Sequence, residues 1–191
     1  MRMRLAVVVI LTSAAHAAAA EEEESPHALG LAAGIGSVSA ARQNGQEVDG
    51  RGAGAYAQAQ FIFRPAHWFT PRLYAGTVLA PPDSGSCGTG VEPCDVSAKI
   101  FFFGAKFRLM APIPYVGPFI ELGLGGSVGH SSTRSGQQVD ATGKGLMYHV
   151  PFGVGLALGE RHQFEIAGQG LVHPEQKQIC GGFALGVTLD L

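Results

Sequence analysis

The sequence has little charge and, beyond its N-terminus, no long apolar run. Charged residues make up 15% of the 191 residues, against about 25% in ordinary soluble domains. After residue 20 no window offers the ~18 unbroken apolar residues that a membrane helix needs. The formal net charge of −2 gives no basic surface for nucleic acid. Such a chain is either a soluble protein with an apolar core or a membrane barrel.

Motifs of common catalytic and metal sites are also missing. Neither H-E-x-x-H nor G-x-x-x-x-G-K-[ST] occurs, and the three cysteines lack paired C-x-x-C spacing. One G-x-S-x-G match, centred on Ser127, is followed by polar sequence rather than by the helix that exposes such a serine. We therefore expect no cofactor and no metal site, and we interpret the match as a chance occurrence.

The N-terminus has the pattern of a secretory signal peptide. Arg2 and Arg4 precede an apolar segment, and small residues follow it. We expect residues 1–20 to be the signal peptide, with cleavage after Ala20. Cleavage after Ala17 and an uncleaved membrane anchor are the alternatives. Residues 21–26 then form a disordered lead-in, and residues 27–191 have the length of one domain.

Strict alternation of apolar residues is clearest in the last nine residues. Every second position there is apolar: Phe183, Leu185, Val187, Leu189 and Leu191. Similar alternation predicts eight strands, at residues 27–40, 54–64, 68–80, 96–109, 115–129, 144–158, 162–172 and 183–191. Long and short connections alternate between them, as in transmembrane barrels. The fold class predicted is all-β, an eight-stranded antiparallel up-and-down transmembrane β-barrel.

Side-chain volume indicates which face of this barrel points inward. An eight-stranded barrel has an interior just wide enough for side chains to fill. The apolar set contains many phenylalanines, whereas the opposite set is rich in glycine and alanine. Glycine accounts for 28 of the 191 residues of the whole chain. The apolar set is therefore predicted to face lipid. The alternative is a secreted soluble lipocalin-like barrel, which has its apolar face inside.

A few ionic and polar side chains belong to the inward set. The predicted lumen ionic network consists of Lys106, Arg108, Glu121, Glu165 and His149. A charge with little water around it needs a partner, so we expect Lys106 or Arg108 to pair with Glu121. We interpret the network as a structural plug, and a proton or ion path is the alternative.

Three short turns are predicted, near residues 65, 112 and 160. Aromatic residues gather beside the first two. They are Phe63, Trp68, Phe69, Phe107 and Tyr115. Membrane barrels carry aromatic girdles at both interfaces, so these residues are predicted to be interfacial, with ordinary turn packing as the alternative.

Three cysteines occur in a chain that the signal peptide predicts to be exported, where disulfides can form. Cys87 and Cys94 fall in one predicted outer loop of an exported chain, so a disulfide between them is favoured. Cys180 is left over, and its pairing with either of the others is the alternative.

Across residues 27–191 this pattern resembles the small outer-membrane barrels of the OmpA transmembrane-domain type. The resemblance implies a Gram-negative cell outer membrane, with membrane lipid and lipopolysaccharide as neighbours. It also implies insertion by the barrel-assembly machinery, which reads the terminal strand Phe183–Leu191. That strand usually ends in an aromatic residue in this family, whereas it ends in Leu191 here. We expect a monomer that binds no nucleic acid, and no peptidoglycan-binding domain after the barrel.

Two classes of function remain. The first is a non-enzymatic barrel that is structural or binds a ligand or a surface through its extracellular loops. The second is a lipid A modifying enzyme of the PagL or PagP type, because His130, Ser131 and Ser132 fall at the predicted outer rim. These residues do not match the family site closely enough to carry over roles, and a solvated loop is the favoured interpretation of them.

Overall fold

The computed structural model describes residues 25–39, 50–81, 85–87, 94–135, 138–175 and 178–191. The predicted signal peptide lies outside this part of the chain, as do residues 21–24 of the lead-in. Nine strands occur in it: β1 His27–Ser39, β2 Gly50–Phe63, β3 Phe69–Ala80, β4 Gly85–Cys87, β5 Cys94–Met110, β6 Val116–Ser135, β7 Gln138–Leu158, β8 Phe164–His173 and β9 Gln178–Asp190. The described residues include no helix long and apolar enough to cross a membrane.

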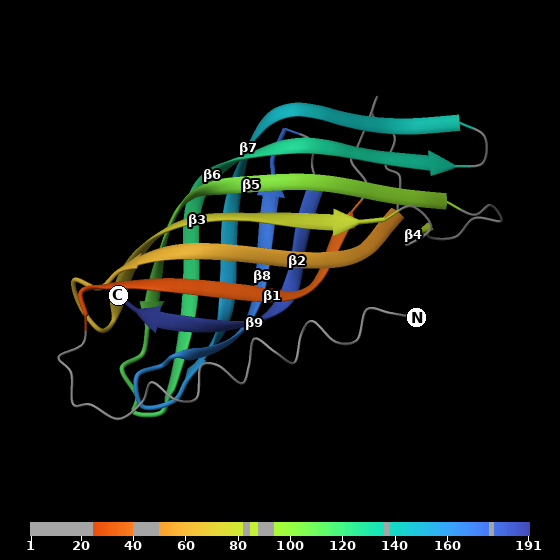
Figure 1. The fold of residues 1–191 in the computed structure, drawn as a ribbon. Helices are drawn as coiled ribbons and strands as arrows, with labels where there is room; N and C mark the ends of the chain where they lie inside the picture. Colours follow the sequence, from red (N-terminus) through yellow and green to blue (C-terminus); the bar gives the residue numbers. More distant parts are fainter. Residues whose placement is uncertain (1–24, 40–49, 82–84, 88–93, 136–137, 176–177) are drawn as a thin grey trace.

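The strands close into a barrel in which every pairing is antiparallel (Figure 1). β1 pairs with β2 on one side and with β9 on the other, so the sheet has no open edge at this level. Eight strands form the wall, and the short β4 adds to the start of β2 through the pairs Gly50↔Cys87 and Gly52↔Gly85. The predicted fold class is confirmed.

The first and last wall strands form a closely fitted seam. Leu29 lies opposite Leu189 and Ile35 opposite Phe183. A Cβ atom on Gly34 would lie 1.9 Å from the carbonyl oxygen of Phe183, so only glycine allows this approach. The sequence pattern at the C-terminus thus corresponds to the strand that closes the barrel.

Several strands are longer than predicted. Two predicted strands end at residue 129 and begin at residue 144, but β6 continues to Ser135 and β7 begins at Gln138. Likewise, β9 begins at Gln178 rather than at residue 183. The prediction followed apolar alternation, whereas strand pairing depends on backbone hydrogen bonds, which polar residues make equally well. β5, β6 and β7 therefore extend beyond their neighbours at the end opposite the C-terminus (Figure 1).

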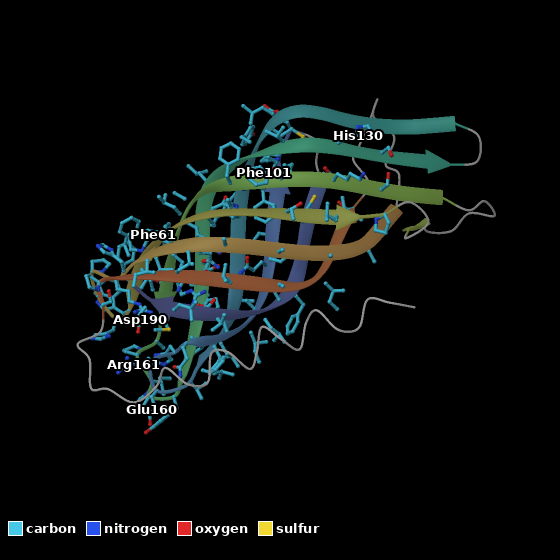
Figure 2. All side chains as sticks on the ribbon, in the orientation of Figure 1. Phe61, Phe101, His130, Glu160, Arg161 and Asp190 are labelled. Atoms are coloured by element: carbon cyan, nitrogen blue, oxygen red, sulfur yellow. The ribbon has the colours of Figure 1, made fainter. Side chains whose placement is uncertain are left out.

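Large apolar side chains lie on the outside of the wall. Ile35, Leu124 and Leu146 are 70%, 70% and 73% exposed, and Phe61 and Phe101 lie on the same outer surface (Figure 2). This arrangement is the predicted one and is the reverse of a soluble lipocalin-like barrel. The outside is apolar because the large apolar residues occupy every second position of each strand, and alternate residues of a strand point to opposite faces.

The inside of the barrel is filled. The prediction described it as small residues with a few ionic groups, but it also holds a buried apolar cluster that includes Phe102, Ile100 and Val78. They fill the lumen toward the long-loop end, because an eight-stranded barrel leaves room for side chains and little else.

Candidate functional site in the barrel lumen

A cluster of five charged side chains crosses the lumen near the end with the short turns. Arg72 comes from β3, Lys106 and Arg108 from β5, Glu121 from β6 and Glu165 from β8. Each is 2–6% exposed. The strand register brings these side chains together, because Arg72 lies opposite Lys106 and Arg108 lies opposite Glu121 on neighbouring strands.

Short ion pairs connect these five residues. The Glu121 carboxylate accepts hydrogen bonds from Lys106 Nζ at 2.6 Å and from Arg108 Nε at 2.9 Å. Arg108 also donates both terminal nitrogens to Glu165, at 2.6 and 2.7 Å, in the forked geometry typical of arginine and carboxylate. Both predicted candidates, Lys106 and Arg108, therefore contact Glu121, and the cluster continues to Glu165.

Arg72 adds a third cation to the cluster. Its Nη1 donates to Gln60 Oε1 at 3.1 Å and to Glu165 Oε1 at 3.3 Å. The Arg108 guanidinium also lies 3.5 Å from the centroid of the Phe119 ring. Three cations thus face two carboxylates in a setting where each charge depends on its partners. Arg72 is not among the residues of the predicted network.

His149 does not belong to this cluster, which corrects the prediction. On β7 the residue opposite Glu121 is Gly153, and His149 lies four residues further along the strand, about 13 Å away at ~3.3 Å per residue. It shares the inward face with the ionic residues but not their level in the barrel. The alternation of the sequence predicts the face of the strand on which a residue lies. Only the register between strands determines its height along the barrel axis.

His149 instead belongs to a second polar network, which sequence reasoning missed. Its Nε2 lies 2.6 Å from the Tyr74 hydroxyl, and its Nδ1 lies 2.8 Å from Ser127 Oγ. The same serine oxygen lies 3.0 Å from His173 Nε2. The predicted strand 162–172 ends one residue before His173, although His173 continues the alternation of β8.

The serine of the G-x-S-x-G match is at the centre of this second network. Ser127 is completely buried and lies within strand β6. No strand-to-helix elbow exposes it, so it lacks the accessibility that a nucleophilic serine needs. Its role in the structure is to join two buried histidines.

Below the ionic cluster, the short-turn end of the barrel contains a cavity of about 800 Å³. The three short turns form its rim, and Thr70, Arg72, Arg108 and Glu165 are among the residues deeper in it. Two turns are joined by His162 Nε2, which lies 3.0 Å from the Ile113 carbonyl oxygen. Figure 2 shows Glu160, Arg161 and Asp190 at this end.

The predicted interfacial aromatics lie around this same end. Trp68 and Tyr115 are 57% and 60% exposed. The Trp68 and Phe69 rings are 5.7 Å apart between centroids, and those of Phe69 and Phe107 are 6.3 Å apart. Phe63 packs separately against Phe61 and His27.

The remaining predicted residues are not brought into a common site. The side chains of Cys87 and Cys94 lie outside the described part of the chain, so their disulfide stays a prediction. Cys180 is a buried free thiol on the inward face of β9. At the opposite end from Arg161 (Figure 2), His130 is exposed, and Ser132 Oγ lies 2.8 Å from Ser97 Oγ. The Ser131 side chain is outside the described part.

The described residues contain no group of three or more histidine, cysteine, aspartate or glutamate side chains that could hold a metal ion.

Comparison with known proteins identifies the fold. Neisserial surface protein A has a TM-score of 0.60 and 10% identity, over 89% of this chain and 100% of that one. The attachment invasion locus protein Ail of Yersinia pestis has a TM-score of 0.51 and 14% identity, over 88% of this chain and 100% of that one. The chain has the fold of the small eight-stranded outer-membrane barrels. No protein-family profile and no curated protein sequence matches it. The barrel fold is therefore shared with proteins that are only 10–14% identical to this chain in sequence.

Proposed function

We propose that this protein is a non-enzymatic integral barrel of the cell outer membrane, with a lumen closed by polar and ionic side chains. The supporting observation is that the closed wall exposes large apolar side chains outward while five charged residues are buried inside it. An apolar exterior suits lipid, and a filled interior suits a scaffold better than a channel.

The long loops are the part of such a scaffold that would bind partners. The end of the barrel that carries them faces the cell exterior if the short turns and the barrel termini are periplasmic, as in other outer-membrane barrels. One structural relative is named for attachment and invasion, and another is named as a surface protein. This arrangement supports the proposal of a structural role, or of a ligand-binding or adhesive role through the outer loops. Outer-membrane lipid and lipopolysaccharide would surround a monomer inserted by the barrel-assembly machinery.

Membrane fractionation with heat-modifiable gel mobility tests the location and the fold together. The protein should sediment with outer membranes and should migrate differently when loaded unheated and after boiling. Recovery as a soluble protein without detergent would overturn the proposal.

Conductance in planar lipid bilayers tests the closed lumen separately. We expect no steady open pore from the wild-type protein, because ion pairs of 2.6–2.9 Å span the lumen. A steady open state would show that the ionic cluster is part of an ion path instead.

A lipid A modifying activity has less support, because the structure assembles no site from the described rim residues. Mass spectra of lipid A from cells with and without the protein would decide the matter. A spectrum that changes with the protein would favour the enzyme over the proposal made above.

A further inference from the structure

Two completely buried histidines share one hydroxyl group in the part of the lumen toward the long loops. Ser127 Oγ lies 2.8 Å from His149 Nδ1 and 3.0 Å from His173 Nε2, and the centroids of the two rings are 5.6 Å apart. His149 Nε2 extends the chain to the Tyr74 hydroxyl at 2.6 Å. Side chains from four strands, β3, β6, β7 and β8, therefore form one hydrogen-bonded chain.

The barrel wall leaves room for this chain at a glycine. A Cβ atom on Gly125 would lie 2.6 Å from His149 Nε2 and would also collide with the Tyr74 hydroxyl. Only glycine thus allows these two side chains to meet against β6. The contact between the tyrosine and the histidine therefore depends on the backbone as well as on the side chains.

Neutral histidine rings satisfy this chain. Ser127 has a single hydroxyl proton, which it donates to one histidine while it accepts a hydrogen bond from the other. If both rings were protonated, both would donate to Ser127, and its own proton would have no acceptor in the chain. A proton on His173 alone would also need an acceptor at Nδ1, which has no hydrogen-bond partner among the described residues.

Among the described side chains, no carboxylate offsets a positive charge on either ring. Glu121 of the ionic cluster is opposite Gly153, four residues from His149 along β7, and Glu175 is exposed beyond the end of β8. Lys106 Nζ, 5.6 Å from the centroid of the Tyr74 ring, is itself a cation. The remaining groups around the rings are uncharged: Tyr56 on β2, Phe102 on β5, Gln178 and Cys180 on β9, and Val38 on β1. Protonation therefore adds a buried charge without a partner.

We propose that neutral His149 and His173 keep this part of the lumen closed and that their protonation opens it at acid pH. In the opened state water surrounds the rings and stabilises a charge that the closed state cannot accommodate. Opened rings take up protons below the ordinary histidine pKa of about 6.5, so the closed state has its full stability above that pH and loses it below. This inference goes beyond the proposed function, and it rests only on the buried network.

The thiol of Cys180 reports such an opening. Cys180 is a completely buried free cysteine on β9, two residues from Gln178, which lies opposite His173. The full-length protein in detergent micelles is treated with dithiodipyridine, a disulfide that also reacts with thiols in acid. Mass spectrometry quantifies the modified Cys180 peptide. At each pH the rate is divided by the rate for the protein unfolded in urea, which removes the pH dependence of the reagent itself.

The normalised rate for the wild type should rise at least about tenfold for each pH unit below ~6.5, because each proton bound on opening contributes a factor of ten per unit. This measurement needs no variant. A normalised rate that stays constant down to about pH 5, where an ordinary histidine is charged, would overturn the proposal.

Substitution by glutamine tests whether the two histidines cause the rise. Each of H149Q and H173Q removes one titrating ring and should lower the slope of the rate against pH, and H149Q/H173Q should abolish the slope. H130Q, which removes an exposed histidine near the same end, should leave the slope unchanged.

Heat-modifiable mobility and a low Cys180 rate at neutral pH show that each variant starts folded and closed. If the double variant is already open at neutral pH, the two single variants decide. Slopes in the closed histidine variants equal to that of the wild type would overturn the proposal, because acid would then act through another group, such as the Glu121 carboxylate.

Discussion

At the scale of single residues, the lumen depends on a balance between buried charges. Three cations and two carboxylates share the ionic cluster, and both carboxylates contact more than one cation. Removing one partner of a buried pair leaves an uncompensated charge, which costs far more than the pair itself contributes. The sign of the charge removed should therefore decide the effect of a substitution.

We predict that Glu121→Gln destabilises the barrel by ~3–5 kcal/mol, because it leaves three cations facing one carboxylate. Lys106→Met should cost clearly less, since it leaves two cations facing two carboxylates. Urea unfolding of the protein in lipid vesicles measures both. Glu175→Gln, at an exposed site near the other end, is the control. A loss from Lys106→Met as large as that from Glu121→Gln would contradict the charge-balance argument.

Ser127 is the second position where one residue has a large effect. Its hydroxyl contacts ring nitrogens of both His149 and His173, and all three residues are completely buried. Ser127→Ala should cost ~1–3 kcal/mol for each ring nitrogen left without a partner. Ser132→Ala is the matched control, since its hydroxyl contacts Ser97 in a partly buried position. Equal losses of unfolding free energy in the two variants would show that the histidines find other partners.

At the scale of elements, the closing strand is the most constrained. β9 pairs with β8 on one side and with β1 on the other. The residue after it, Leu191, also bonds to the first residue of β1, since the Leu191 N–H donates to the His27 carbonyl oxygen at 3.2 Å. The end of the chain therefore fixes both the seam and the start of β1.

Deleting residues 189–191 should block assembly, because it removes the pair Leu29↔Leu189 and the bond from Leu191 to His27. Deleting residues 43–45, in the connection between β1 and β2, should leave assembly nearly intact, because insertions and deletions are tolerated in loops. Surface labelling and heat-modifiable mobility in cells compare the two variants. Normal surface levels of the C-terminal truncation would show that the terminal strand is less important than its pairing suggests.

At the scale of the whole molecule, the barrel has its large apolar side chains outside and its charge inside. Leu124 is 70% exposed on the wall and Ile113 is 51% exposed in a short turn. If the surface faced water, an arginine at either exposed position would have a similar effect on stability. In a bilayer the cost depends on depth, because charge is expensive at the centre and cheap at the interface.

Leu124→Arg should therefore destabilise the protein in lipid vesicles by ~2–4 kcal/mol, whereas Ile113→Arg should cost only ~0–1 kcal/mol. Unfolding titrations in vesicles of defined thickness compare them. Equal losses of unfolding free energy for the two variants in vesicles would mean that Leu124 does not lie near the bilayer centre.

Much of the fold could be predicted from the sequence because the alternation of apolar residues is local information. It fixed the number of wall strands, the outward face and the short turns. It failed for residues 130–135 and 138–143 and for His173, where strands continue through polar sequence. In those places backbone hydrogen bonds between neighbouring strands extend the sheet, and no side-chain pattern reports them.

The sequence by itself determined which residues point into the lumen, since a period of two assigns each residue to a face. Only the tertiary structure decided which of them meet. Glu121 and Glu165 are 44 residues apart in the sequence and share Arg108, whereas His149, on the same face, lies at another level and joins Ser127 instead. The level of a residue along the barrel depends on the register of every strand between it and its partner, and that register is set by the closure of the whole sheet.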